Sequence, residues 1–421
     1  MFEQTKAIII GGGPAGLAAA LCLHQRTNII CSVYELRPEP TTLGGAIGIL
    51  PNGLRLLHRL GVHDKLMSRG SSHSNVVMHS MQGSVLGEQD ITGAAREQTG
   101  FGYMRIKRTD LLDVLLEAVR HAKIPVHYNK ALTSITSNEE VVEATFSDGT
   151  TDTADLLLGC DGIHSSVRRL YVDPARAPEY SGMAGIGSII PASLLTESAA
   201  SQLRGMHVTM TQDGLFMAMT CTASDEEIYW GFSKEVSQPE SGDTRDGWEV
   251  RRKEEVEGFK SALLGLLESA GGEWGSMMRQ MVDHTSVVKF YPIYKLPLGG
   301  AWSKNRCLLL GDAAHAMPPH AGQGVSMALE DAFLISRLLK DRTRSLGDVY
   351  KTFDKIRRIR VDEIATRAAQ NADMRKKTSP WGLWLKEIGI WMYMHGPWAF
   401  GMDKWGSERK HMVYDIDKEE L

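Results

Sequence analysis

Residues 7–16 read AIIIGGGPAG, an apolar β-branched run that passes directly into a glycine-rich turn. The run is typical of a buried parallel strand, and the Ala/Leu-rich sequence that follows, to about residue 25, predicts a helix. In this spacing one glycine permits a tight turn, one lets a pyrophosphate approach the backbone, and one lets helix and strand pack closely. We therefore expect a dinucleotide at the helix N-terminus, bound by Gly11, Gly13, Ala15 and Gly16.

A second apolar run, residues 29–34, predicts the next strand and ends at Glu35. Glu35 follows the last glycine at the distance where a carboxylate accepts hydrogen bonds from the ribose hydroxyls of a dinucleotide. Arg37, two residues later, is a further candidate for contact with the adenosine. Strand, helix, strand and acid are thus in the order of a Rossmann-type unit.

The bulk composition indicates an ordinary globular protein of about two domains. The chain has 421 residues, 43% hydrophobic and 23% charged, and a formal net charge of −4. This balance gives no basic footprint for nucleic acid. Five cysteines without a CxxC pair indicate buried thiols in a reducing, cytoplasmic location. No secretory signal is expected at the N-terminus. No metal is expected either, because His315 and His320 do not share a helix face.

Two further motifs lie far downstream, each directly after an apolar run. The first is Asp161-Gly162-x-x-Ser165-x-x-Arg168, and the second begins with Gly311-Asp312. A second glycine-rich turn, residues 318–324, then leads into a predicted helix over residues 325–339. A helix N-terminus at this point would stabilise negative charge on a bound group.

In this order the three motifs resemble those of the class A flavoprotein monooxygenases, the para-hydroxybenzoate hydroxylase-like family, over most of the chain to about residue 375. The resemblance implies that all three motifs bind one FAD. In that family the Gly-Asp carboxylate, here Asp312, holds the flavin ribitol. Asp161 is implied in contacts with both FAD and the reduced nicotinamide. The helix N-terminus that faces the flavin pyrimidine ring matches Gly322, Gly324 and Val325.

Two other segments share this resemblance. Arg108, with Arg105 as the weaker candidate, resembles the family's arginine at the start of a helix over the cofactor. Residues 44–48, GGAIG, resemble the turn that passes beside the isoalloxazine, with Gly48 as a cofactor-binding residue.

The predicted fold is α/β: a Rossmann-type FAD-binding domain, interrupted by an antiparallel β-sheet substrate domain and followed by a helical C-terminal segment. Residues 1–175 and 290–375 are expected to form the FAD-binding domain, because the second glycine motif returns after a stretch of short β-rich runs. Residues 176–289 are expected to form the substrate-binding sheet. Residues 376–421 form an aromatic C-terminal segment.

The function implied is that of an NADPH-dependent monooxygenase that forms a flavin C4a-hydroperoxide from O2 and inserts one oxygen atom into a small molecule. NADPH is expected to bind transiently in a groove, since no second Gly-x-Gly-x-x-Gly follows a strand. The substrate is expected to be hydrophobic, aromatic or polycyclic. Tyr229 and His207 are the catalytic candidates, and cross-strand packing is the favoured alternative explanation of both.

Three alternatives remain beside this function. A flavin halogenase is disfavoured because the Trp-x-Trp-x-Ile-Pro signature is absent. A flavin dehydrogenase without oxygen insertion and a non-catalytic flavin redox sensor stay open. Several relatives that hydroxylate phenols carry an arginine on the first strand of the sheet domain. Residues 185–191, GIGSIIP, have none, which argues against a small anionic substrate.

The sequence near the C-terminus is unusually aromatic between residues 380 and 402. Charged residues and prolines interrupt it, so it is not expected to cross a membrane. Packing against the enzyme body, a subunit contact and peripheral contact with a membrane surface all remain open.

Overall fold

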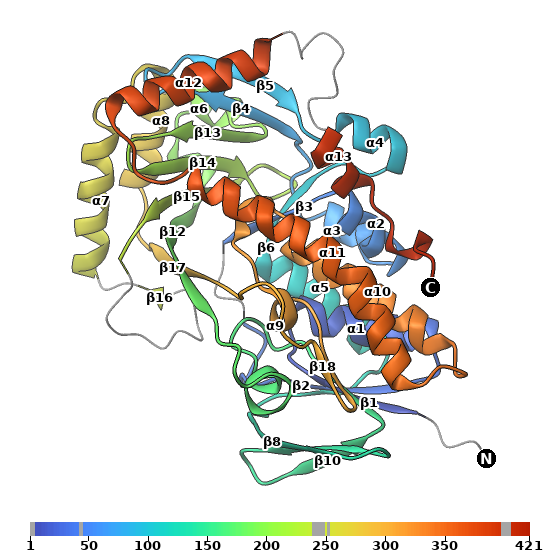
Figure 1. Ribbon diagram of the computed structural model, residues 1–421. Coiled ribbons are helices and arrows are strands. Elements are labelled where there is room, and N and C mark those ends of the chain that lie inside the picture. Colours follow the sequence, from blue (N-terminus) through green and yellow to red (C-terminus); the bar gives the residue numbers. More distant parts are fainter. Residues whose placement is uncertain (1–4, 42–44, 238–248, 251–252, 397–405) are drawn as a thin grey trace.

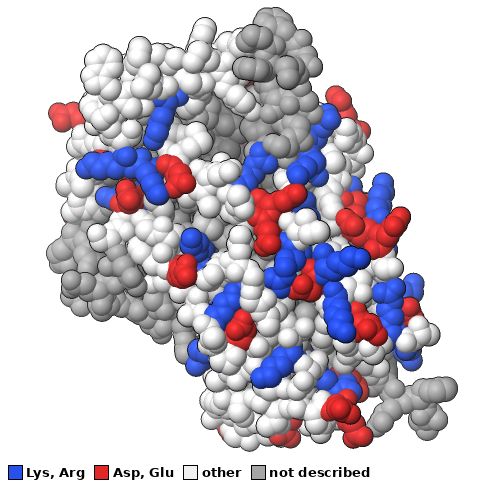
Figure 2. All heavy atoms as spheres, in the orientation of Figure 1, with Lys and Arg blue, Asp and Glu red and all other residues white. Residues whose placement is uncertain are grey.

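The computed structural model describes residues 5–41, 45–237, 249–250, 253–396 and 406–421 (Figure 1). Gly44, Trp398 and Phe400, which the sequence patterns singled out, lie outside these residues. Two sheets dominate the fold, the smaller built around β1 and the larger at the opposite end of the molecule. On the face drawn in Figure 2, positive and negative side chains are interspersed, and the upper edge of the molecule is mostly uncharged.

The first sheet has six strands in the order β18-β19-β11-β1-β2-β7. Every neighbouring pair is parallel except β18 with β19. The strands are β1 (Lys6–Ile10), β2 (Ile30–Tyr34), β7 (Val126–His127), β11 (Leu156–Gly159), β18 (Ser303–Lys304) and β19 (Cys307–Leu309). This is the predicted Rossmann-type arrangement, and β11 and β19 join it from distant parts of the sequence.

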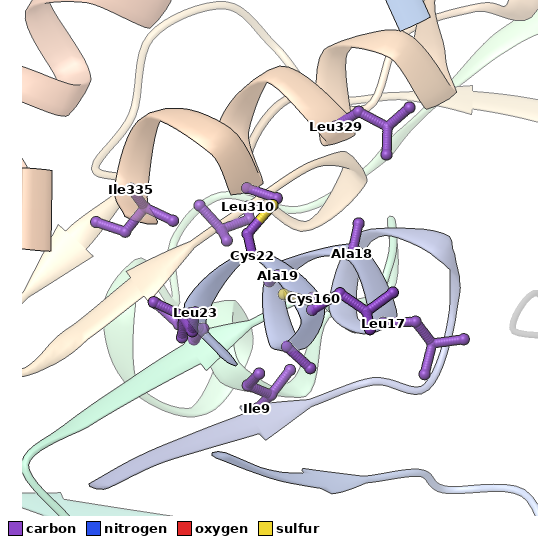
Figure 3. Packing of buried hydrophobic residues seen from close by; sticks show 14 of the residues in the cluster. Ile9, Leu17, Ala18, Ala19, Cys22, Leu23, Cys160, Leu310, Leu329 and Ile335 are labelled. Atoms are coloured by element: carbon purple, nitrogen blue, oxygen red, sulfur yellow. The ribbon is translucent and has the colours of Figure 1, made fainter. Parts of the chain in front are cut away.

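Helix α1 (Pro14–Arg26) lies between this sheet and α10 (Gly324–Lys340), as Figure 3 shows. Residues 16–23 of α1 are all buried. A helix that is covered on both sides needs apolar side chains all round, and small alanines let its neighbours approach closely. Leu329 and Ile335 of α10 complete this core from the other side.

The second sheet has eight strands in the order β16-β17-β12-β15-β14-β13-β4-β5. Its strands are β4 (Asn75–His79), β5 (Val85–Asp90), β12 (Glu179–Pro191), β13 (Met206–Met210), β14 (Gly214–Thr220), β15 (Glu227–Glu235), β16 (Glu249–Val250) and β17 (Lys289–Lys295). Helices α7 (Lys253–Leu267) and α8 (Gly272–Asp283) contribute to the apolar cluster over one face, around Phe216 and Trp230.

The sheet corrects two details of the sequence interpretation. Strands β4 and β5 belong to it although they lie within residues 1–175, so the first segment of the chain contributes to both sheets. The sheet is also not wholly antiparallel, because β13 pairs with β4 in parallel. The domain boundaries themselves stay a prediction.

The remaining elements connect and cover these two sheets. The strands are β3 (Ala46–Ile49), β6 (Met104–Lys107), β8 (Leu132–Ser137), β9 (Val142–Phe146) and β10 (Thr151–Ala154). The helices are α2 (Pro51–Arg59), α3 (His63–Met67), α4 (Gly93–Thr99), α5 (Arg108–His121), α6 (Glu197–Gln202), α9 (Asp312–His315), α11 (Leu346–Asp373), α12 (Pro380–His395) and α13 (Gly406–Val413). Among the described residues, no helix combines the length and apolar character needed to cross a bilayer.

Candidate functional site

The carboxyl ends of four parallel strands bring the three glycine motifs to one edge of the first sheet. Strands β2, β1, β11 and β19 are neighbours in that order. The residues that directly follow them include Glu35, Gly11, Asp161 and Gly311. Parallel strands end at a common edge, where open α/β sheets bind their ligands.

The first turn is shaped by Gly11 and Gly16, which no larger residue could replace. A Cβ atom on Gly16 would lie 1.9 Å from the carbonyl oxygen of Gly11, so helix and strand touch there. Gly11 has φ +108°, and a Cβ on it would lie 2.4 Å from the carbonyl oxygen of Cys160. A Cβ on Gly13 would meet nothing within 4 Å. The turn therefore packs at both ends and is open at Gly13, beside Ala15 at the start of α1.

Glu35 is held next to this turn by the backbone. Its Oε2 accepts a hydrogen bond from Gly12 N at 2.7 Å, and its Oε1 accepts one from Arg37 N at 3.0 Å. Each carboxylate oxygen has a second lone pair, so both can still accept from a ribose. The Arg37 side chain donates to Thr41 Oγ1 at 2.9 Å.

Of the two carboxylate oxygens of Asp161, one accepts hydrogen bonds and the other has no hydrogen-bond donor among the described residues. Its Oδ2 accepts from Ser166 N at 2.6 Å and from Val167 N at 3.1 Å. Its Oδ1 is buried and has no hydrogen-bond partner among the described residues. Burial raises the pKa of this carboxyl. A buried, unpaired acceptor is costly, so a donor from a bound group would stabilise it.

Arg168, which the sequence analysis quoted only as part of a motif, joins two motifs. Its buried guanidinium donates to the carbonyls of Ile163 and Ala313, the latter at 2.7 Å. The loop after β11 is thereby fastened to the loop after β19. The role of Arg168 is to hold the two loops in register.

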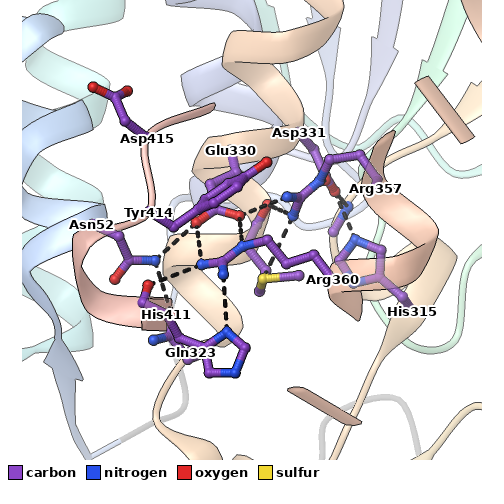
Figure 4. Close-up of polar contacts among 12 residues, drawn as sticks. Asn52, His315, Gln323, Glu330, Asp331, Arg357, Arg360, His411, Tyr414 and Asp415 are labelled. Carbon is purple, nitrogen blue, oxygen red and sulfur yellow. Dashed lines mark hydrogen bonds and ion pairs between the residues drawn. The ribbon is translucent and has the colours of Figure 1, made fainter. Parts of the chain in front are cut away.

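Asp312 is exposed, yet burial of its surroundings raises the pKa of its carboxyl. A carboxylate that is exposed to solvent and also has a pKa raised by burial lies in a recess of the protein surface. The turn that contains Asp312 is held in place by the fully buried Asp331. Asp331 Oδ2 accepts from Gly311 N and from His315 Nε2, each at 2.7 Å (Figure 4).

A buried ionic network extends from Asp331 along α10 (Figure 4). Arg357 donates to Asp331 at 2.7 Å and to Glu330 at 2.6 Å, and Arg360 donates to Glu330 at 2.8 Å. Asn52 of α2 donates to Glu330 at 2.8 Å. Because every carboxylate oxygen has a charged or amide donor, the network fixes α10 against α2 and α11.

The N-terminus of α10 is open, as expected for a helix that receives a ligand. Gly322 and Gly324 are exposed, and a Cβ on either would meet nothing within 4 Å. Gly322 has φ +64°, which favours glycine. Val325 packs partly against the main core. Gln323 between them is buried and accepts from Asn52 at 2.9 Å, which anchors the turn.

The two-stranded sheet of β3 and β6 carries the other cofactor candidates. Gly48 lies opposite Arg105, and a Cβ on Gly48 would lie 2.4 Å from the Tyr103 hydroxyl, so close packing requires glycine there. Arg108 begins α5, and its backbone N donates to Gly45 O at 3.1 Å. Its exposed side chain is near enough to lower the pKa of Asp312 by its positive charge.

Tyr229 lies where the two halves of the molecule meet. A Cβ on Gly45 would lie 2.3 Å from its ring. Burial raises the pKa of Tyr229 against the opposing charges of Arg105 and Arg108. Sequence reasoning missed Tyr291. Burial raises the pKa of Tyr291 as well, and the positive charge of Arg108 opposes this shift. The place of Tyr291 at the start of residues 290–375, the segment expected to return to the FAD-binding domain, is the signal that could have identified it.

A cavity of about 120 Å³ opens beside Tyr229. Its lining comes from the β3 loop, from β12, β15 and β17, and from the segment before β17. These residues are Gly45, Gly187, Ser188, Ile189, Tyr229, Val287 and Lys289. Lys289 is the one cation among them. It lies opposite Gly187 in the sheet, so both face the side that carries Tyr229.

The structure does not bring His207 to this cavity. Met206 pairs with Met219, and Met219 pairs with Tyr229, so these three share one face of the sheet. His207, one residue further, points to the opposite face, where its ring contacts Trp274 of α8 at a tilt. By the same alternation Phe216 faces α8, away from Met217 and Met219. Tyr229 alone of the two catalytic candidates lies in the site.

These residues fit a flavin dinucleotide. The orphaned Asp161 Oδ1, the open space beside Gly13 and Gly324, and the recessed Asp312 all face the edge of the first sheet. Among the residues with described placement, no cluster of three potential metal ligands occurs.

Comparison with known proteins gives four related findings. The FAD binding domain family matches residues 4–262 and 298–368. The 6-hydroxynicotinate 3-monooxygenase of Pseudomonas fluorescens is 31% identical over 350 residues, which cover 81% of this chain and 84% of that protein. The 3-amino-4-hydroxybenzoate 2-monooxygenase of Streptomyces cremeus is 29% identical over 372 residues, 88% of each chain. The crystal structure of Klebsiella pneumoniae HpxO with FAD and uric acid superposes with a TM-score of 0.80 at 20% identity, covering 99% of this chain and 98% of that one.

Proposed function

Because this chain belongs to the FAD binding domain family and is an FAD-dependent monooxygenase, we propose that it uses NADPH and O2 to insert one oxygen atom into an aromatic ring. The convergence of Gly13, Glu35, Asp161 and Asp312 at one edge of the first sheet carries the proposal. The cavity beside Tyr229 lies next to Gly45, on the turn that the family resemblance sets beside the isoalloxazine.

The chain's own residues bind and orient the reactants. With FAD bound, Glu35 would accept a hydrogen bond from the ribose, Asp161 Oδ1 would accept one from a hydroxyl of the cofactor, and Asp312 would accept one from the ribitol. When bound, FAD supplies the redox chemistry and the activation of O2. The raised pKa of Tyr229 keeps its phenol protonated at neutral pH. Tyr229 therefore donates a hydrogen bond to the ring substrate rather than removing a proton from it.

The substrate is an aromatic ring that carries an acidic group. Lys289 supplies the cation that residues 185–191 of β12 lack, from the neighbouring strand β17. The two curated relatives are named for a hydroxynicotinate and an aminohydroxybenzoate. An ammonium that faces a partly buried cavity would pair with a carboxylate or phenolate of this kind.

The location is a reducing compartment, the cytoplasm. All five cysteines are free and buried. Burial raises the pKa of Cys31, Cys221 and Cys307 to about 12, so these thiols are inert to oxidation.

The test is a turnover assay under ¹⁸O2 with the purified holoenzyme. A panel of hydroxylated pyridine and benzene carboxylates is screened for compounds that accelerate NADPH oxidation. One ¹⁸O atom in the product is the expected result. Product without ¹⁸O but with two electrons removed would establish a dehydrogenase instead. FAD binding without turnover on any compound would favour a redox sensor.

A further inference from the structure

Helix α12 presents a broad apolar face to the outside of the protein. Six large hydrophobic side chains of this helix are between 42% and 76% exposed. They are Trp381, Trp384, Leu385, Trp391, Met392 and Tyr393, which we call the aromatic face. With 3.6 residues per turn they lie on one continuous side of the helix. In Figures 1 and 2 the helix lies at the upper rim of the molecule, where the surface is mostly uncharged.

The opposite side of α12 is firmly attached to the second sheet. Leu383 is buried in the core of that sheet. A Cβ on Gly87 of β5 would lie 2.7 Å from Met394, so helix and strand are in contact. Glu387 is buried and accepts from Met81 N at 2.8 Å. The orientation of the helix is therefore fixed, and the aromatic face is its outward side.

The acidic and basic side chains of this helix also differ between its inner and outer sides. Glu387, the one carboxylate of residues 380–395, is turned inward. Lys386 lies at the edge of the aromatic face and donates to Met374 O at 3.0 Å, and His395 is exposed at the end of the helix. Lys376 and Lys377 precede the helix and pair with Asp373 and Asp213. Within residues 380–395 the outward side thus has no acid to repel an anionic lipid headgroup. Basic groups lie along its rim, and the neighbouring acids Asp373 and Asp213 are paired with lysines.

We propose that the aromatic face of α12 docks in the headgroup region of a phospholipid membrane, with the helix parallel to the surface. Tryptophan and tyrosine prefer this interface because their rings are apolar with one polar atom. The helix has 16 residues and is about 24 Å long, shorter than the roughly 30 Å hydrocarbon core, so it lies on the membrane and does not span it.

The size of the face favours a lipid surface over a second copy of the chain. A helix about 24 Å long and about 10 Å wide has a footprint on the order of 240 Å². A stable dimer buries about 800 Å² per partner. A protruding helix with large aromatic residues is well suited to insert a few ångströms into a bilayer.

The experiment is sedimentation of the FAD-loaded, full-length enzyme with phosphatidylcholine vesicles, with and without phosphatidylglycerol. We expect binding that increases with phosphatidylglycerol. The triple variant Trp381→Ser, Trp384→Ser, Trp391→Ser should lower the partition coefficient by at least about tenfold. The matched control, Leu298→Ser with Ile359→Ser, removes exposed apolar side chains elsewhere and should leave binding unchanged. FAD content and turnover of a water-soluble substrate confirm that each variant is folded.

A second measurement needs no variant. Brominated lipids in the vesicles should quench part of the tryptophan fluorescence of the wild-type enzyme. The proposal is overturned if the enzyme does not co-sediment with vesicles and brominated lipids do not quench its tryptophan fluorescence. It is also overturned if the triple variant only converts a dimer into a monomer, or only lowers the melting temperature, because the face would then contact a second copy or the chain itself.

Discussion

At the scale of single residues, the site combines groups that we propose bind the cofactor directly with groups that hold them in place. Asp312 faces open space, whereas Asp331 beneath it is completely enclosed by donors. Arg168 links two loops and contacts carbonyl groups only. Substitutions should therefore separate affinity for the cofactor from stability of the fold.

Asp312→Ala should raise the Kd for FAD by about 10- to 100-fold, since a hydrogen bond to a charged group contributes about 1.5–3 kcal/mol. Fluorescence titration of the apoenzyme with FAD measures this. Asp64→Ala, which removes a fully exposed carboxylate, is the control. An Asp312→Ala protein that retains FAD as tightly as the wild type would contradict the assignment.

Tyr229→Phe should reduce kcat/KM by about tenfold to a hundredfold, the effect of losing one donor of about 1.4–2.8 kcal/mol. FAD content should not change, because the ring and its contact with Gly45 remain. Steady-state NADPH oxidation with the best aromatic substrate is the measurement. Tyr171→Phe, near the surface, is the control, and equal rates in both variants would remove Tyr229 from the site.

Lys289→Met should raise KM for a carboxylated ring by about tenfold, or 1.4 kcal/mol, and leave the uncarboxylated ring unaffected. Lys289→Arg keeps the charge and should restore most of the affinity. The comparison of KM values for matched acids and amides checks this. An equal loss for both kinds of substrate would indicate a packing role for Lys289.

At the scale of elements, a histidine pair joins the two strands that meet in parallel. His79 Nε2 of β4 is 3.0 Å from His207 Nδ1 of β13. The His79 ring stacks on Trp274, and the His207 ring contacts Trp274 at a tilt. Burial lowers the pKa of His79 to about 4, and burial also lowers that of His207. The pair is therefore neutral in the folded protein. Because His207 lies on the face that α8 covers, we assign it a role in stabilising the fold and not in catalysis.

This pair predicts a loss of stability in acid. A histidine in the unfolded chain takes up a proton near pH 6.5, while His79 in the fold resists protonation until about pH 4. The free energy of unfolding should thus fall as the pH drops from 6.5 to 4, by up to about 1.4 kcal/mol per pH unit for this group. His79→Gln retains a hydrogen-bonding side chain and should flatten the slope in urea unfolding. An unchanged slope would show that other groups cause it.

At the scale of the whole molecule, the ionic network connects parts of the chain that are far apart in sequence. Glu330 binds Asn52 of α2 and Arg360 of α11, and Arg360 also donates to His411 O of α13 at 3.1 Å. Asp331 extends the same network to Gly311. The network therefore connects the turn at Gly311, helix α2 and the C-terminal helix α13.

Arg357→Met should destabilise the protein by about 3–5 kcal/mol, because Glu330 and Asp331 are left buried without their shared cation. Thermal and urea unfolding of the holoenzyme measure the loss. Arg358→Met, on the same helix but partly exposed and paired only with Asp354 among carboxylates, should cost less than about 1 kcal/mol. Similar losses in the two variants would contradict a central role for the network.

The sequence by itself determined the nucleotide-binding part of this protein. An apolar run, a glycine turn, a helix and Glu35 are consecutive, so local propensity and spacing suffice to predict their arrangement. The parallel placement of β11 and β19 followed because their motifs repeat the same strand-to-turn pattern.

Only the tertiary structure decided the substrate side. Alternation along a strand shows that Tyr229 and Trp230 face opposite ways, but not which of them lines the cavity. That depends on the register with β14 and on the helices that cover the other face. Pairing of β4 with β13, the cavity position of Lys289, and the burial of Asp331 likewise arise from contacts between residues distant in sequence. Such contacts depend on register and packing across the whole fold, which no local pattern encodes.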